Sequence, residues 1–426
     1  MPQSSLRRII DPFVLVFTTL IGILYAYTAW SLTDLPWLQI ALAIPFIFVW
    51  IVPVVYWHGQ RESRQMRLMD HIVHVACFLS MGWLNFVTSL TVLQDLLSTV
   101  FLEIGQLRGA TEGTATVSPG PLWPPWAGEH GEFAIIFAAT LCWLLGTLKA
   151  TRGPLLKEVE VEIPNLHPFL HHLRIVQISD LHVGTTIRQN YVERIVAQSN
   201  ALHPDLVVLT GDLVDGSVED LGDHALPLRD LRATYGSFMC LGNHDYYSGS
   251  EKWTQFWTQH AGVVVLRNEH VSIPIKPPLG ERPDGNAPVL LMVAGVIDPA
   301  VRLEGTGDKP DPHKALATPY LTSPRPAPLA THALKLMLAH NPKLSALVAS
   351  AGFDLQLSGH THAGQFLPWT WATRLVHHPH YVGLSHEGKM TVYVNPGTGS
   401  WGPPLRFGTT TELTLLRLVP GNDLVG

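Results

Sequence analysis

The distribution of apolar residues divides this chain into two parts. Up to about Ala150, long apolar stretches follow one another with few charges between them, whereas the residues from Thr151 onward alternate short apolar runs with polar turns. A helix needs about 20 mostly apolar residues to cross a bilayer. The pattern therefore predicts a transmembrane region over residues 1–150 and a globular domain over residues 151–426.

Four stretches of the first part reach or approach the length of a membrane span: residues 9–32, 35–57, 71–97 and 133–148. The fourth is the shortest. A cleaved signal peptide is the alternative for the first stretch, because Arg7 and Arg8 precede it. Its apolar run is long, however, and no small-residue cleavage site follows. We therefore predict an anchor of four transmembrane helices.

Basic residues gather on one side of these stretches. The loops of that side hold eight cations and the opposite loops hold one, Arg108. By the positive-inside rule both termini, and with them the globular domain, are predicted to be cytoplasmic. The assignment reverses if the short fourth stretch does not span. The eight cations are Arg7, Arg8, Arg61, Arg64, Arg67, Lys149, Arg152 and Lys157.

Charge and cysteine content exclude some classes of protein. The net charge of −6 and the pI near 6.4 show no basic excess, so no nucleic-acid partner is expected. The three cysteines lie within apolar runs and form no Cys-x-x-Cys pair. Nothing in the sequence therefore requires an oxidising compartment.

Five apolar runs of the second part are typical of buried parallel strands: RIVQIS, LVVLT, SFMCL, LKLML and DLQLS. Residues 187–200 and 251–260 have helical apolar spacing, which indicates a layered βαβ arrangement. We expect strands around residues 391–395 and 412–418 to complete a second sheet. The Pro- and Gly-rich residues 276–288 and 298–329 are expected to be loops.

Each of the five runs is followed at once by a motif of acidic, amide or imidazole side chains. Such groups at the carboxyl ends of strands suit a pair of borderline divalent ions. A single Asp-x-His is common, but two imidazoles one residue apart at a strand end are hard to explain by packing. The motifs are Asp180-Leu181-His182, Gly211-Asp212-Leu213-Val214-Asp215, Gly242-Asn243-His244-Asp245, Ala339-His340-Asn341-Pro342 and Gly359-His360-Thr361-His362.

In this order, the motifs resemble those of the calcineurin-like metallophosphoesterases, and GHTHAGQ resembles a membrane-attached bacterial branch of that family. The resemblance implies an α/β fold, a four-layer α/β/β/α sandwich, at the bacterial inner membrane. It also implies two divalent metal ions, with Mn, Fe or Zn expected. The first ion would be bound by Asp180, His182, Asp212 and His362, and the second by Asp212, Asn243, His340 and His360.

The resemblance also assigns catalytic roles. His244 would protonate the leaving oxygen, and Asp245 would orient His244 or its turn. Asp215 is expected beside the ligands without binding metal, and Gln365 and Arg406 match positions that could touch substrate. The histidines at 377, 378 and 380 are interpreted as a polar loop facing solvent rather than a third metal site.

These features predict a membrane-anchored two-metal phosphoesterase. A metal-bridging hydroxide would hydrolyse a phosphoric ester or anhydride, carried by a phosphorylated small molecule or a lipid-linked substrate. The motifs do not separate monoesterases, diesterases and pyrophosphatases. The alternative is a catalytically silent, metal-containing scaffold or binding module at the membrane. A regulated transporter is less favoured, because few polar residues lie within the apolar stretches.

Overall fold

The computed structural model describes residues 12–61, 68–112, 131–276, 289–320 and 332–421. The chain forms two compact units. The N-terminal helices and the short segment Pro403–Phe407 make up the first unit. The second unit contains Lys149–Gly402 and the residues from Gly408 onward.

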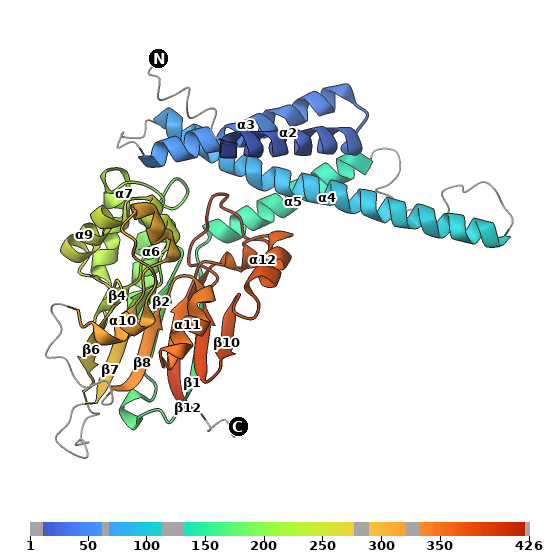
Figure 1. Cartoon of the computed structure of the whole chain (residues 1–426). Coiled ribbons are helices and arrows are strands. Elements are labelled where there is room, and N and C mark those ends of the chain that lie inside the picture. The colour runs from blue at the N-terminus through green and yellow to red at the C-terminus, as the bar shows by residue number, and fades with distance from the viewer. Residues whose placement is uncertain (1–11, 62–67, 113–130, 277–288, 321–331, 422–426) are drawn as a thin grey trace. The chain divides into compact units, whose positions relative to one another are not determined.

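Within the described residues, all four apolar stretches of the first part form helices (Figure 1). The helices are α2 (Pro12–Leu32), α3 (Pro36–Arg61), α4 (Leu68–Glu112) and α5 (Gly131–Thr151). Two segments among the described residues are long and apolar enough to cross a membrane, namely His71–Val100 within α4 and the whole of α5. The short fourth stretch is therefore a full-length candidate span, whereas an anchor of four spans stays a prediction.

The second unit contains two six-stranded sheets (Figure 1). The first has the order β1 (Leu155–Pro164), β12 (Glu412–Gly421), β2 (Arg174–Ile178), β3 (Leu206–Leu209), β4 (Ser237–Met239) and β5 (Val264–Val265). The second has the order β10 (Gly383–Glu387), β11 (Met390–Val394), β9 (Leu355–Ser358), β8 (His332–Leu338), β7 (Leu290–Gly295) and β6 (Glu269–Pro274).

One strand was assigned to the wrong sheet. Residues 412–418 were expected in the second sheet, but β12 lies in the first, parallel to β1 and antiparallel to β2. Its side chains are buried on both faces, as in any central strand: Leu416 and Leu418 face the space between the sheets, and Leu413 and Leu415 face the outer helices. A run buried on both faces does not reveal its pairing partner, which here lies far away in the chain.

The unit has four layers, and apolar side chains pack between them. Between the sheets, residues such as Val208 of β3 pack with Leu336 of β8 and Leu357 of β9. The outer face of the first sheet is covered by α6 (Gln189–Ala201), α7 (Val218–Ala225) and α9 (Ser250–His260). The outer face of the second is covered by α10 (Pro312–Ala317) and α11 (Ser345–Ser350). The expected α/β/β/α arrangement is thus observed.

One of the two expected loops differs from the structure. Residues 298–329 include the 3₁₀ helix η4 (Pro299–Glu304) and α10, and their residues 321–329 lie outside the described part. Residues 277–288 also lie outside it. The remaining short helices are η2 (Pro168–Leu170), η3 (Leu226–Asp230), α8 (Asn243–Tyr247), η6 (Pro342–Leu344), η7 (His362–Gly364) and α12 (Trp369–His377).

Candidate metal centre

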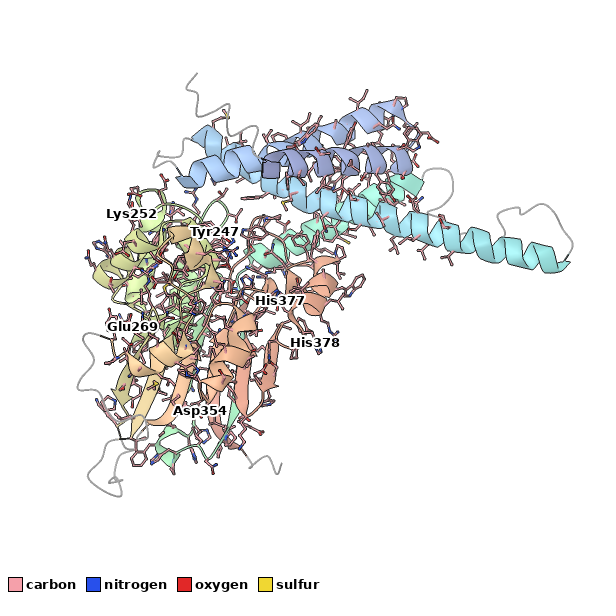
Figure 2. All side chains as sticks on the ribbon, viewed as in Figure 1. Tyr247, Lys252, Glu269, Asp354, His377 and His378 are labelled. Atoms are coloured by element: carbon pink, nitrogen blue, oxygen red, sulfur yellow. The ribbon has the colours of Figure 1, made fainter. Side chains whose placement is uncertain are left out.

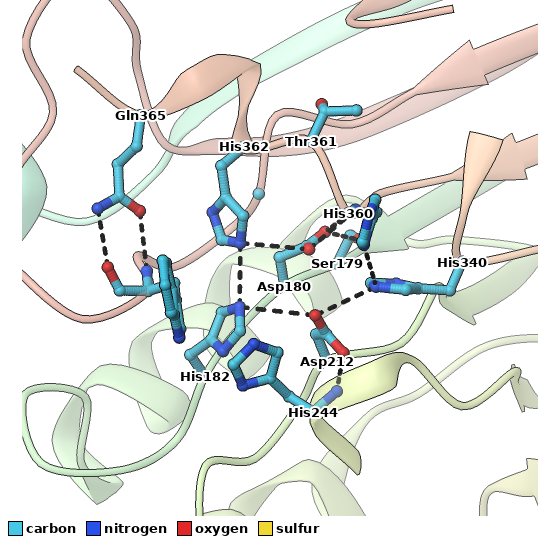
Figure 3. A network of polar contacts seen from close by, with 12 residues as sticks. Ser179, Asp180, His182, Asp212, His244, His340, His360, Thr361, His362 and Gln365 are labelled. Atoms are coloured by element: carbon cyan, nitrogen blue, oxygen red, sulfur yellow. Dashed lines mark hydrogen bonds and ion pairs between the residues drawn. The ribbon is translucent and has the colours of Figure 1, made fainter. Parts of the chain in front are cut away.

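The turns that follow β2, β3, β4, β8 and β9 bring the motif side chains together (Figure 3). Strand pairing explains this convergence. β2, β3 and β4 are mutually parallel in one sheet, and β8 and β9 are parallel in the other. The carboxyl ends of parallel strands share one edge of a sheet, which is where α/β folds place ligands.

A first group consists of Asp180, His182 and His362, whose nitrogen and oxygen atoms are close enough to hold one metal ion. The Nε2 atoms of His182 and His362 are 3.0 Å apart, and His362 Nε2 is 3.4 Å from Asp180 Oδ1. All three residues are buried.

A second group consists of Asp212, His340 and His360. His340 Nε2 lies 3.1 Å from Asp212 Oδ2 and 3.2 Å from His360 Nδ1. The side-chain oxygen of Asn243 lies 3.2 Å from His340 Nε2 and 3.0 Å from His360 Nδ1. Asn243 thus adds a fourth donor to this group.

Asp212 lies between the two groups. Its Oδ2 is 3.9 Å from His182 Nε2 and 3.1 Å from His340 Nε2, while its Oδ1 accepts a hydrogen bond from the backbone N–H of His244 at 2.7 Å. One carboxylate oxygen therefore faces both groups, which is the placement required of a bridging ligand.

The chemistry of these donors fits a pair of divalent cations. The two histidines of each group bring ring nitrogens to 3.0 and 3.2 Å of one another, so both can reach a shared cation when each offers its lone pair. His340 Nδ1 donates to Thr210 O at 2.8 Å, which leaves its Nε2 free to bind metal. Burial and the neighbouring His340 lower the pKa of His360 to about 3, so this imidazole is neutral, as a ligand must be.

The two carboxylates differ in their surroundings. Burial raises the pKa of Asp180 above its ordinary value, so a bound cation would favour its ionised form. Burial also acts to raise the pKa of Asp212, but the nearby imidazoles, His340 foremost, hold it well below the ordinary value. Asp212 is thus the more strongly anionic of the two carboxylates.

Unusual backbone conformations direct these side chains toward the centre. Five of the seven expected ligands have a positive φ, which costs roughly 1–2 kcal/mol per residue outside glycine. Hydrogen bonds between the turns help to hold this conformation. Asp180 N donates to Gly211 O at 2.9 Å, and His182 N donates to Asp212 O at 3.0 Å. The five residues are Asp180 (51°), His182 (52°), Asp212 (54°), His360 (74°) and His362 (49°).

Glycines precede three of the expected ligands, and at two of these positions a side chain would overlap a carboxylate. A Cβ atom on Gly242 would overlap Asp212 Oδ1, and one on Gly359 would overlap Asp180 Oδ2. The glycines of GNHD and GHTH therefore allow the backbone to approach the two carboxylates.

His244 lies beside the centre and is held by Asp215. Its Nδ1 is 2.7 Å from Asp215 Oδ1, and the same oxygen lies 3.0 Å from His182 Nδ1. Burial opposes the charged imidazolium, but the carboxylates of Asp215 and Asp212 outweigh burial and raise the pKa of His244 to about 9. One carboxylate therefore orients both a candidate ligand and the candidate acid.

Asp245 contacts backbone rather than the ring of His244. Its carboxylate accepts hydrogen bonds from the N–H groups of Asp212, Leu213 and Gly242 at 2.9, 3.0 and 2.8 Å. Of the two roles that sequence suggested for Asp245, the structure places it at the turn. Asp215 is the residue that contacts the imidazole.

Gln365 and Arg406, the two residues that could touch substrate, are both buried. The Gln365 side chain is buried and bonds the backbone of Trp401 twice, with Nε2 donating to Trp401 O at 2.8 Å and Oε1 accepting from Trp401 N at 2.9 Å. Gln365 thus positions a loop. Arg406 is fully buried within the segment Pro403–Phe407, outside the unit that carries the motifs.

Two aromatic residues near His244 were not predicted from the sequence. The rings of Tyr247 and Trp401 lie 5.3 and 5.7 Å from that of His244, and both side chains are partly exposed. Tyr247 stands three residues after His244, a spacing that could have identified it on a helix. Trp401 reaches the site through a distant loop, and nothing in the local sequence marks it.

The histidines at 377, 378 and 380 do not form one solvent-facing loop. His380 is buried, with Nδ1 bonded to Ser385 Oγ at 2.7 Å and Nε2 to Glu387 Oε2 at 2.9 Å. His377 is half-buried, and only His378 is exposed as expected. Hydrogen bonds to Ser385 and Glu387 of β10 hold the His380 side chain in its buried position.

Comparison with known proteins identifies the family. Residues 173–364, which contain every expected ligand, match the calcineurin-like phosphoesterase family. An uncharacterised metallophosphoesterase of Campylobacter jejuni is 32% identical over 292 residues, covering 67% of this chain and 69% of that protein. The chain belongs to the calcineurin-like phosphoesterase family.

Other relatives of this calcineurin-like phosphoesterase come from animals as well as bacteria. A transmembrane protein with metallophosphoesterase domain from Danio rerio is 35% identical over 286 residues, covering 66% of this chain and 61% of the relative. The UDP-2,3-diacylglucosamine pyrophosphatase LpxG of Chlamydia muridarum is 27% identical over 338 residues, covering 67% of this chain and 95% of LpxG. The chain thus spans about two thirds of the length of its C. jejuni and D. rerio relatives.

Proposed function

We propose that this calcineurin-like phosphoesterase is a membrane-anchored hydrolase that cleaves a phosphoric ester or anhydride at a two-metal centre. The observation that carries the proposal is the position of Asp212, whose Oδ2 faces one histidine of each group, at 3.9 and 3.1 Å. Two ligand groups that share a carboxylate are the arrangement used by two-metal phosphate hydrolases.

Seven residues would hold the two cations. When bound, the divalent pair, expected to be Mn, Fe or Zn, supplies a water of lowered pKa and neutralises charge on the phosphoryl oxygens. Asp212 bridges the two groups, and Asn243 completes the second with a neutral oxygen. The assignment is Asp180, His182, Asp212 and His362 for one ion and Asp212, Asn243, His340 and His360 for the other.

His244 is the group placed to protonate the leaving oxygen. Because its Nδ1 is engaged by Asp215 at 2.7 Å, the proton that it can donate is on Nε2. The carboxylate stabilises the imidazolium before transfer and keeps the ring in one orientation. Asp245 supports this step indirectly, by fixing the turn that carries Asn243 and His244.

The substrate that we favour is lipid-linked. Two candidate spans support membrane attachment, and the D. rerio relative is named a transmembrane protein. LpxG, which is aligned over 95% of its length, is named a pyrophosphatase of a diacylated nucleotide sugar. We extend these observations to a four-helix anchor, a cytoplasmic catalytic unit and an amphiphilic phosphoanhydride or phosphoester.

The test uses the full-length protein in nanodiscs, supplied with Mn²⁺, Fe²⁺ or Zn²⁺. Hydrolysis is measured on p-nitrophenyl phosphate, bis-p-nitrophenyl phosphate and UDP-diacylglucosamine, with Asp212→Asn as the inactive control. We expect turnover by the wild type and none by Asp212→Asn. A protein that binds both ions yet cleaves none of these substrates would favour the scaffold alternative.

A second comparison tests the lipid preference. The nucleotide sugar without acyl chains is offered beside the acylated form in mixed micelles. We expect a higher kcat/KM for the acylated form. Equal values for the two substrates would contradict the lipid-linked assignment without affecting the proposed hydrolysis.

A further inference from the structure

The helix α12 (Trp369–His377), which closely follows the GHTH motif, turns its apolar side outward. At 100° per residue, its apolar residues occupy one continuous arc and its three half-buried residues another. The large apolar side chains are exposed: Trp369 by 55%, Trp371 by 67%, Leu375 by 82% and Val376 by 61%. No residue of the helix is buried.

Three polar residues of α12 face the protein instead. Thr370, Thr373 and His377 are the half-buried positions of the helix. The ring of His377 lies 5.7 Å from that of His360, one of the expected metal ligands. His377 is the residue labelled at the end of α12 in Figure 2. A helix on a water-facing surface ordinarily has the opposite arrangement, with its apolar arc against the core.

We propose that α12 is an interfacial helix that lies in the surface of a lipid bilayer, with Trp369, Trp371, Leu375 and Val376 at the boundary between head groups and acyl chains. The exposed arc is the hydrophobic face that such a helix requires. The proposal rests on the membrane attachment in the proposed function, but not on hydrolysis.

The charge around α12 favours a lipid surface as the partner. No acidic residue occurs from position 366 to 385, although the whole chain carries a net charge of −6. Arg374 is exposed beside the apolar arc, where its guanidinium can meet anionic head groups while its stem follows the acyl boundary. Tryptophans are enriched at this depth of a membrane.

The short connection between α5 and the catalytic unit also limits how far this unit can lie from a bilayer. Only residues 152–154 separate the end of α5, a candidate span, from the first strand of the catalytic unit. Three extended residues bridge at most roughly 15 Å. The catalytic unit is therefore tied closely to the membrane that α5 is proposed to cross.

This placement has a consequence for the substrate. The inner side of α12 contacts the second ligand group through His377 and His360, so the metal centre lies directly behind the interfacial helix. A phosphate at head-group level would then be near the centre while its lipid tails stay in the bilayer. The exposed arc thus favours substrates presented by the membrane.

The test is photo-crosslinking in the full-length protein, reconstituted in nanodiscs of phosphatidylethanolamine and phosphatidylglycerol. The photoreactive amino acid p-benzoylphenylalanine replaces Leu375. The matched control carries it in place of Leu347, an apolar residue of α11 that is 40% exposed. We expect lipid adducts, identified by mass spectrometry, at position 375 and not at 347. Equal lipid adducts at both positions, no lipid adduct at 375, or adducts to protein only would each overturn the proposal.

An activity assay on two substrates distinguishes the interfacial role of α12 from the proposed hydrolysis. The double variant Trp371→Glu/Leu375→Glu should lose about tenfold or more in kcat/KM on a substrate embedded in the bilayer, because two buried apolar groups are removed from the lipid. It should keep wild-type activity on p-nitrophenyl phosphate, and Leu347→Glu should resemble the wild type on both. An unchanged rate on the embedded substrate would count against the interfacial helix, whereas inactivity of the wild type would count only against the hydrolase.

Discussion

The carboxylate of Asp215 is expected to support metal binding and proton transfer at once. Its Oδ1 accepts from His182 Nδ1 at 3.0 Å and from His244 Nδ1 at 2.7 Å. The substitution Asp215→Asn keeps the size and one accepting oxygen but removes the charge. Hydrogen bonds to charged groups contribute about 1.5–3 kcal/mol, against about 0.5–1.5 for neutral ones. Each of the two bonds should therefore lose about 1–1.5 kcal/mol.

A free-energy loss of about 1.4 kcal/mol corresponds to a factor of ten in a rate or binding constant. The two weakened hydrogen bonds should therefore have two separately measurable effects. The weaker hold on His182 should raise the metal concentration needed for activity about tenfold, in line with the usual effect of removing a carboxylate behind a metal-binding histidine. The weaker hold on His244 should lower kcat at saturating metal about tenfold. The assay is the initial rate on a phosphodiester as a function of Mn²⁺ concentration.

The matched control is Asp223→Asn, which neutralises an exposed aspartate of α7 and should change neither quantity. If Asp215→Asn leaves both the metal dependence and kcat at wild-type values, the account of Asp215 is refuted. A change in metal dependence alone would show that Asp215 acts only through His182.

Two further predictions concern the surroundings of the centre. His244→Ala should retain metal but lose about 10²–10⁴-fold in rate on an alkyl-oxygen leaving group and less on an aryl one, because a good leaving group needs less protonation; equal losses on both substrates would exclude the acid role. Gln365→Ala removes the two hydrogen bonds that hold Trp401, each worth about 1 kcal/mol. The melting temperature, followed by calorimetry, should fall by about 2–8 °C while the metal content is unchanged; an unchanged melting temperature would show that the Trp401 loop does not depend on Gln365.

Local patterns in the sequence were sufficient for much of the fold. The apolar runs before Asp180, Asp212, Asn243, His340 and His360 are all strands or strand ends, because a run buried on both faces has few other structures available. β12 was assigned to the wrong sheet, since its pairing with β1 and β2 joins segments distant in the chain. The structured pieces of residues 298–320 were also missed, because short helices among Pro and Gly give little periodicity.

In the candidate site, too, the residues within a motif were predictable, whereas contacts between segments distant in the chain were not. Residues within the five motifs follow the carboxyl ends of parallel strands in the two sheets, and the apolar run before each motif predicts its strand. The partner of His244 could not be read from the sequence, since Asp245 is adjacent in the chain but Asp215 is adjacent in space. Trp401 and the outward apolar arc of α12 likewise depend on tertiary contacts.

Asp212 is proposed to join two metal sites, and the number of metal ions bound per chain tests this role. Elemental analysis of the fully metallated, full-length protein should give two divalent ions per chain. Asp212→Asn should weaken both sites together, whereas His182→Ala should empty mainly one. One ion per chain in the wild type, or an Asp212→Asn variant that keeps both ions at wild-type affinity, would contradict the account.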